Sequence, residues 1–152
     1  MPGGIGLTAW LGKTYAALGF DIVGGADGML AGFRSVLGEN ADILVSDESA
    51  TYRPEMQWLA ARANETGAQW QVQRAEDFNR ESKIENQKSL YRFFEQFDLP
   101  NIPAARAIMD AAANGTRVTP PFKPWIEEKI WLALFWSRPL REFWRRELSE
   151  RN

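Results

Sequence analysis

The chain has 152 residues and a net charge of −2, so it is long enough for one domain with a substantial core and carries no large basic surface for nucleic acid. It contains neither cysteine nor histidine, which excludes disulfides, Cys/His zinc sites, thiol nucleophiles and Ser-His-Asp triads. The longest apolar run, residues 130–136, is far shorter than the ~20 residues that span a bilayer. Because no disulfide framework or signal-peptide pattern is present, we expect a cytoplasmic protein without membrane or nucleic-acid partners.

Residues 1–45 predict two helices that alternate with two strands. Thr8 can act as the N-cap of a helix that continues to about residue 18. Residues 20–23 form a short apolar run closed by two glycines, which predicts a strand. A second helical stripe follows at 29–37, and the continuous apolar run at 43–45 predicts a second, buried strand.

The middle of the chain predicts one helix and two further strands. Pro54 fits the first turn of a helix, whose apolar spacing predicts a buried face made of Met56, Leu59, Ala60 and Ala63. Residues 69–72 alternate polar and apolar, which favours a strand at or near a sheet edge. Residues 76–88 favour one helical turn and a loop. The aromatic run at 90–94 favours a strand, with a helix to residue 97 as the alternative.

The last third of the chain is predicted to be mostly helical. A helix is expected at 103–113, and a short strand begins at Val118 and is cut off by the two prolines that follow. Everything after Pro124 predicts helix, with a break at Pro139.

The alternation of strands and helices predicts an α/β fold. We expect a Rossmann-like, three-layer domain with a mostly parallel sheet of about four or five strands and a C-terminal helical segment. The pattern is interpreted as a single domain over residues 1–152. The chain opens on a glycine-rich turn, residues 2–6, that no element precedes, and it ends inside a helical pattern without a cap, so we expect this domain to be a fragment of a longer protein.

An acidic loop follows the strand predicted at 43–45. Ligands of open parallel sheets bind outside the carboxyl ends of the strands, so this loop is the best-placed candidate site. Ser46 and Asp47 could bind an amine or a hydroxyl group, or hold Arg53 in place. The alternative is helix capping, with acidic residues near the positive helix terminus and either of two hydroxyl residues as the cap, Ser49 or Thr51.

Two basic residues lie in or after the later predicted strands. Arg92 lies within an aromatic strand, and a guanidinium there can clamp a carboxylate with two parallel hydrogen bonds. The alternative for Arg92 is a structural ion pair with Glu95 or Asp98. Lys123 would lie at another strand end and could bind an anion, or it could simply be solvated.

The segment after Pro124 carries aromatic and aliphatic residues on more than one helical face. A helix that is apolar on several faces is either central in a core or presents one face to a partner. Core packing and docking on another domain are therefore both open.

Three stretches, 45–59, 90–94 and 118–134, together resemble the substrate-binding, pre-ATP-grasp domain of eukaryotic-type glutathione synthetases and of the related glutathionylspermidine synthetases. In that family an acidic loop leads into a helix, a later strand carries a tyrosine and an arginine, and a proline-containing loop precedes a lysine-bearing helix. The segments that match here are 46–55, Tyr91-Arg92, Thr119-Pro120-Pro121 and Glu127-Glu128-Lys129.

The resemblance implies that the parent protein is an ATP-dependent carboxylate–amine ligase, and that this domain holds a peptide or amino-acid-like substrate. Arg92 is the residue that fits the family's contact to a substrate carboxylate. ATP and Mg are expected only in a full-length parent, bound by an ATP-grasp half, so the isolated chain is expected to be inactive. We expect no catalytic or metal-binding residue here, and we expect the substrate to be bound by Ser46, Asp47, Arg53, Arg92 and Lys123.

Two other functions stay open. The chain could be a non-catalytic α/β interaction domain that docks on a partner through its aromatic C-terminal helix. It could also be a standalone small-molecule sensor that uses the same strand ends. A homodimer is compatible with any of the three.

Overall fold

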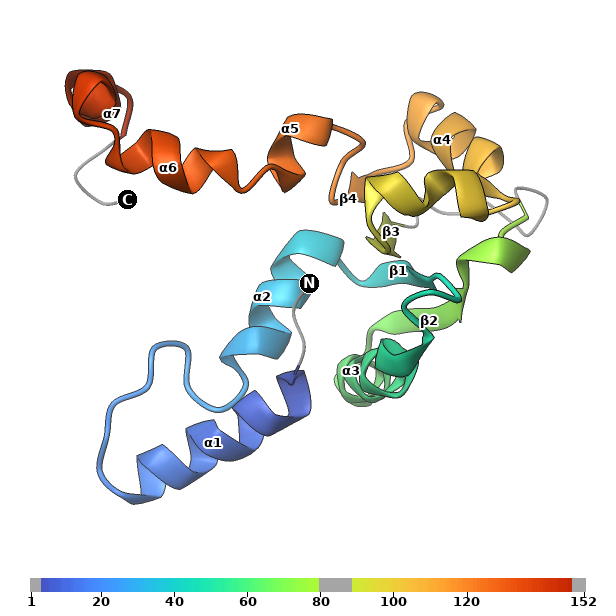
Figure 1. Cartoon of the computed structure of the whole chain (residues 1–152). Coiled ribbons are helices and arrows are strands. Elements are labelled where there is room, and N and C mark those ends of the chain that lie inside the picture. Colours follow the sequence, from blue (N-terminus) through green and yellow to red (C-terminus); the bar gives the residue numbers. More distant parts are fainter. Residues whose placement is uncertain (1–3, 80–88, 149–152) are drawn as a thin grey trace. The chain divides into compact units, whose positions relative to one another are not determined.

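The computed structural model describes residues 4–79 and 89–148, which belong to two compact units (Figure 1). Unit 1 ends at Phe122, and unit 2 begins at Lys123. Unit 1 contains the sheet, and the described part of unit 2 consists of helices.

Unit 1 is built on a sheet of parallel strands, which confirms the predicted α/β fold. The strand order is β2-β1-β3-β4, and each neighbouring pair is parallel. The central strand β1 ends in three fully buried residues, as its continuous apolar run predicted. The edge position predicted for the strand at residues 69–72 is also confirmed, because β2 is the first strand in this order. The strands are β1 (Asn40–Val45), β2 (Gln69–Arg74), β3 (Ser89–Phe93) and β4 (Val118–Thr119).

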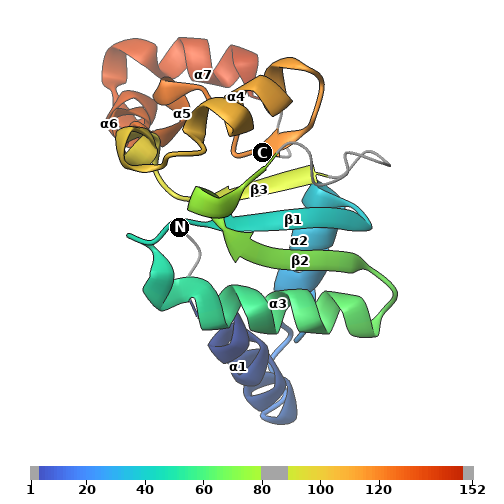
Figure 2. The same ribbon diagram turned by 90° about the vertical axis from the view of Figure 1, so that its right-hand side faces the viewer.

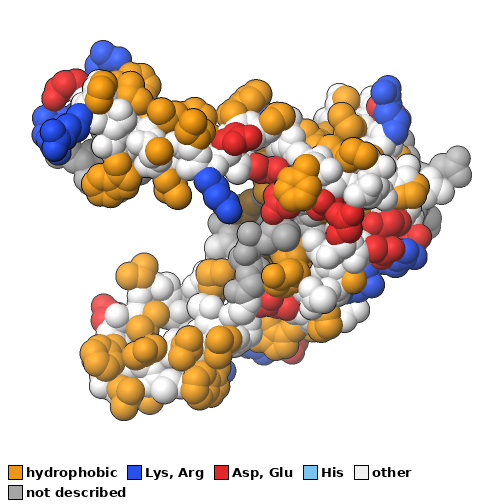
Figure 3. All heavy atoms as spheres, in the orientation of Figure 1, with side chains coloured by type: hydrophobic (Ala, Val, Ile, Leu, Met, Phe, Trp, Pro, Cys, Tyr) orange, Lys and Arg blue, Asp and Glu red, His pale blue; other side chains and the backbone are white. Residues whose placement is uncertain are grey.

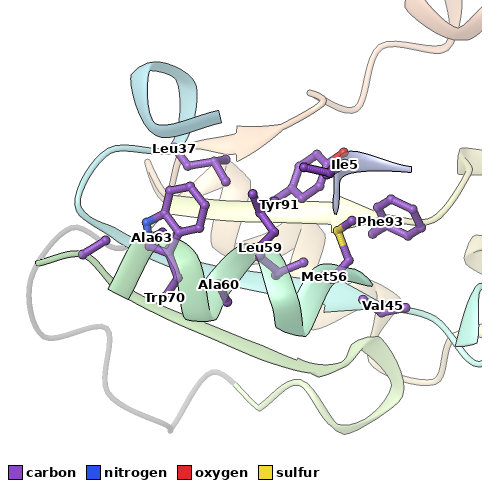
Figure 4. Packing of buried hydrophobic residues seen from close by; sticks show 13 residues of the cluster. Ile5, Leu37, Val45, Met56, Leu59, Ala60, Ala63, Trp70, Tyr91 and Phe93 are labelled. Carbon is purple, nitrogen blue, oxygen red and sulfur yellow. The ribbon is translucent and has the colours of Figure 1, made fainter. Parts of the chain in front are cut away.

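One face of the sheet packs against α2 (Gly28–Leu37) and α3 (Arg53–Glu65), and α1 (Ile5–Ala17) packs on these two helices. All four residues predicted for the inner face of α3 are buried. Figure 4 shows Met56 and Leu59 of α3 beside the strand that carries Tyr91 and Phe93. The inner face of α3 and the alternate residues of β3 that point toward it therefore form one apolar cluster.

The opposite face of the sheet packs against the segment that follows β3. This segment contains a 3-10 helix, η3 (Gln96–Asn101), and then α4 (Ala105–Ala113). Leu44 of β1 and Leu90 of β3 point to this side, where they join Ile108 of α4 in a second buried cluster. In Figure 2, α3 lies below the sheet and α4 lies above it, so unit 1 has the three layers that the sequence predicted.

The predicted strand at 20–23 is wrong. These residues belong to a loop between α1 and α2, and Val23 is fully exposed. Gly19, Gly24 and Gly25 all have positive φ angles, so the chain turns at both ends of the short apolar run. Phe20 instead packs edge-on against Tyr15 of α1, with 5.9 Å between the ring centroids.

The predicted N-cap of the first helix is also wrong. α1 begins at Ile5, and the hydroxyl of Thr8 donates to the carbonyl of Gly4 at 2.9 Å from within the first turn. The backbone N–H of Ile5 is bound instead by the carboxylate of Glu55 on α3. A carboxylate distant in sequence thus binds the positive end of α1, which sequence spacing alone does not reveal.

The outer edge of β2 is partly closed by a side chain. The amide of Asn64, in α3, accepts a hydrogen bond from the N–H of Trp70 at 2.8 Å and donates to its carbonyl at 3.0 Å. The N–H of Gln69 points the other way, to the carbonyl of Glu39 at 2.7 Å. Because alternate residues of a parallel strand point to opposite neighbours, Asn64 occupies the place that another strand would take at Trp70.

Unit 2 is a chain of short helices. The predicted break at Pro139 is confirmed, and the chain also leaves the helical conformation at Glu128. Few of its apolar side chains are covered: Trp136 is 80% exposed and Leu132 is 69% exposed. No helix in the described part of the chain is long and apolar enough to cross a membrane. The elements are α5 (Pro124–Glu127), α6 (Ile130–Trp136), η4 (Arg138–Leu140) and α7 (Arg141–Glu147).

Candidate functional site

The topological switch point of the sheet lies between β1 and β3. The connection that follows β1 runs through α3 on one face of the sheet, and the connection that follows β3 runs through η3 and α4 on the other face. Adjacent strands whose connections leave in opposite directions mark the place where ligands bind in open α/β sheets. Here the loops after Val45 and Phe93 flank that place, and acidic side chains gather on this part of unit 1 (Figure 3). We call it the switch-point edge.

The loop after β1 is held by its own hydroxyl group. Ser46 is 1% exposed, and its Oγ accepts a hydrogen bond from the N–H of Ser49 at 3.2 Å. Neither Ser49 nor Thr51 makes a side-chain cap at the start of the following helical turns, so the predicted capping role is wrong. Ser46 therefore shapes the loop from inside and does not offer its hydroxyl to solvent.

Asp47 is exposed but already paired with two arginines. Its carboxylate accepts hydrogen bonds from Arg74 at 2.6 Å and lies 3.4 Å from Arg53. The hydrogen bond from Arg74, followed by the charges of both arginines, lowers the pKa of Asp47 below its ordinary value despite partial desolvation. The structure thus brings Asp47 and Arg53 together, as the sequence suggested. It adds Arg74, at the end of β2, and Glu76, whose carboxylate binds the N–H of Asp47 at 2.9 Å.

Arg53 is anchored at the start of α3. Its Nη2 pairs with Asp47, whereas its Nε is buried without a hydrogen bond to any described residue. The neighbouring Tyr52 packs on Phe93 of β3, with 5.5 Å between ring centroids. The start of α3 is therefore tied to the ends of both β1 and β3.

Two carboxyl groups face each other across the switch-point edge. Glu48 belongs to the loop after β1, and Asp98 belongs to η3 after β3. The pKa of Glu48 is raised above its ordinary value, chiefly because it shares a hydrogen bond with Asp98. Asp98 is 7% exposed and accepts the N–H of Glu95 at 3.1 Å, while Asn101 donates to Glu48 at 2.6 Å. This pair was not identified from the sequence, because its members are 50 positions apart and no motif links them.

Arg92 is enclosed by backbone carbonyl groups. Its guanidinium donates to the carbonyls of Pro120 at 2.7 Å, Phe94 at 2.8 Å and Pro121 at 3.2 Å, and it stacks over the ring of Phe122. At 2% exposure, it joins the end of β3 to the loop after β4. Binding of a substrate carboxylate by Arg92, as the resemblance implies, stays a prediction and would require that loop to move.

Lys123 opens unit 2 as the residue before α5. It is therefore described with unit 2 and not with the switch-point edge. Its predicted role in binding an anion stays a prediction.

In the parts of the chain that the structure describes, no group of three or more acidic side chains has an arrangement that could hold a metal ion.

Comparisons of the chain with protein-family models, with curated proteins and with solved structures give no match. The functional argument therefore depends on the geometry of unit 1 and on the chemistry of its side chains.

Proposed function

We propose that unit 1 is the substrate-holding domain of an ATP-dependent carboxylate–amine ligase similar to glutathione synthetases, and that its switch-point edge receives the amine-bearing substrate. The observation that supports this proposal is the hydrogen bond from Asn101 of η3 to Glu48 at 2.6 Å, which joins the loops on the two sides of the switch point and places Glu48 beside Asp98. Such a domain binds and orients. ATP, bound by another part of the parent, would activate the carboxylate.

An ammonium group is the ligand that this pair favours. Two neighbouring carboxyl groups repel each other when both are ionised, and this repulsion contributes to the raised pKa of Glu48. An ammonium brings a positive charge and several N–H donors, so it can donate to both carboxyl groups and offset their mutual repulsion. Asp47 is less available for this role because Arg74 and Arg53 already neutralise it.

The predicted residues have different roles in this proposal. Asp47 and Arg53 fix the loop after β1 against the end of β2. Ser46 sets the shape of the same loop. Arg92 is buried and donates to the carbonyls of Pro120 and Pro121, so it stabilises the loop after β4 beside the switch-point edge.

The test compares two ligands that differ only in the amine. Alanine amide carries an ammonium group, and N-acetylalanine amide does not. Titrating the full chain with each, we expect alanine amide to shift the NMR signals of the Asn101 side chain and the Glu95 amide. N-acetylalanine amide should leave both signals in place. Equal shifts with both compounds would exclude recognition of an amine.

A matched pair of variants locates the site. Glu48→Gln removes a carboxylate from the edge and should weaken binding of alanine amide by about tenfold, because it removes a charge-assisted hydrogen bond. Glu65→Gln removes an exposed carboxylate at the end of α3 and should leave binding unchanged. In a parent with an ATP-grasp half, ADP release that depends on the amine tests the ligase assignment separately.

The second candidate is a non-catalytic interaction domain that docks through unit 2. The exposed aromatic and aliphatic side chains of α6 favour it, because a soluble surface rarely presents so many without a partner. Light scattering of the wild type and of a Trp136→Ser, Leu132→Ser double variant tests docking on a second copy. We expect the double variant to shift an oligomer toward monomer. A wild type that stays monomeric at high concentration would exclude self-docking.

A further inference from the structure

Unit 1 contains a cavity that is separate from the switch-point edge and opens to solvent on one side, where Met29 and Val36 are partly exposed. It has a volume of about 240 Å³ and lies between α2 and the β3–β4 side of the sheet. The lining includes Met29, Phe33 and Val36 of α2, together with Tyr91 of β3 and Thr119 of β4. None of the acidic residues or arginines of the switch-point edge contributes to this lining.

The absence of a side chain at Gly32 of α2 helps to keep the cavity open. Gly28 and Gly32 are four positions apart, so they lie on the same side of the helix, and both line the cavity. A Cβ atom at Gly32 would meet no other heavy atom within 4 Å, which means that a side chain there would enter open space. Glycine within a helix costs about 1 kcal/mol relative to alanine, and here its small size provides the volume.

The surface of the cavity is almost entirely carbon. None of the lining residues carries a charge at neutral pH, since burial raises the pKa of the Tyr91 hydroxyl to about 12 and keeps it protonated. A water molecule is held in a cavity by two to four polar partners, which this lining does not offer. Water in this cavity is therefore poorly held, and an apolar molecule gains by displacing it.

We propose that this cavity binds a compact, uncharged apolar ligand, about the size of one substituted ring or two fused rings. An apolar cavity of roughly 150 Å³ can hold benzene, so the larger volume here leaves room for a substituent or a second ring. Charged ligands are disfavoured because the lining offers no partner for a buried charge. The proposal is independent of amine binding at the switch-point edge.

The experiment uses toluene as the probe, with benzoate and benzylammonium as charged compounds of similar shape. In methyl-detected NMR of the full chain, we expect toluene to shift the signals of Met29, Val36 and Leu37. Neither charged compound should do so at the same concentration. No shift with saturating toluene would overturn the proposal, as would equal shifts with benzoate or benzylammonium.

Variants of α2 test the location. Gly32→Leu fills the cavity and should weaken toluene binding by at least about tenfold. Ala31→Leu adds the same side chain at an exposed position of the same helix and should leave the affinity within about twofold. If Gly32→Leu does not fold, Val36→Phe narrows the cavity from its half-exposed rim and should also weaken binding. Unchanged affinity in the variants that fill or narrow the cavity would place the ligand elsewhere and contradict the inference.

Discussion

The two units use similar apolar residues with opposite results. In unit 1, Phe93 and Phe94 are almost completely buried because the sheet has helices on both faces. In unit 2, Trp131, Phe135 and Trp136 stay exposed because a single row of short helices has no second layer. About 30 residues are too few to bury a core of their own. The comparison shows that burial of an aromatic residue depends on the layers around it more than on its helical spacing.

The largest effect should come from the core of unit 1. Phe93→Ala should lower the free energy of unfolding by about 3–5 kcal/mol, because it removes a fully buried ring and leaves a cavity. Trp136→Ala in unit 2 should change it by less than about 0.5 kcal/mol, since that ring is mostly exposed. Urea unfolding of both variants measures the difference. Equal losses would mean that unit 2 has a core after all.

A smaller effect is expected from the buried arginine. Arg92→Met should cost about 2–4 kcal/mol, because the carbonyls of Phe94, Pro120 and Pro121 lose a charged donor. Its counterpart in unit 2 is Arg145→Met, which breaks an exposed pair with Glu142 and should cost less than about 0.5 kcal/mol. Thermal unfolding of the two variants gives the ranking. A mild effect at Arg92 would show that the proline loop is held by other contacts.

The next effect concerns hydrogen bonds between a side chain and the backbone. Asn64→Ala should cost about 1 kcal/mol, because both the N–H and the carbonyl of Trp70 lose their partner at the sheet edge. In unit 2, Trp144→Phe removes a single bond to the carbonyl of Leu134 and should cost less. Hydrogen exchange of the Trp70 amide measures the change directly. Unchanged exchange in Asn64→Ala would argue against protection of the edge.

The smallest effect is a change in pH dependence. The pKa of Glu48 is raised in the folded state, so its contribution is present at pH values below the unfolded pKa, near 4.5, and is lost as the pH rises through the folded pKa. Asp47 has a lowered pKa, so its contribution is present above about 3.8 and is lost as the pH falls through the lower folded value.

Glu48→Gln isolates the first of these contributions. It should remove the component of thermal stability that is present below about pH 4.5 and declines as the pH rises above that value. Melting curves across this range provide the measurement. Identical profiles for wild type and Glu48→Gln would show that the carboxyl pair is not coupled.

The sequence predicted most of the sheet but little of the site. The apolar run of β1 and the spacing of Met56 and Leu59 on α3 are local patterns, and each is confirmed. The strand predicted at 20–23 is wrong because the glycines on both sides of it turn the chain, so that these residues form a loop. The contact of Glu48 with Asp98 depends on the strand order, and local patterns do not contain that order.

The site residues differ in the same way. Asp47 and Arg53 are close in sequence, and their pairing was anticipated. Arg92 was placed correctly at a strand end, but two of the three carbonyls that surround it belong to Pro120 and Pro121, at least 28 residues away along the chain. The sequence therefore predicted that Asp47 and Arg92 lie at the carboxyl ends of strands, but it did not predict how exposed each side chain is.

The amide of Asn64 has a consequence for how copies of this chain can assemble. A sheet with an open flank can recruit strands from neighbouring molecules and grow into fibrils. At Trp70 the backbone N–H and carbonyl are already bound by the Asn64 amide, so a strand from another molecule would have to displace this side chain before it could pair there. Asn64 thus opposes the addition of a further strand at this position of the sheet edge.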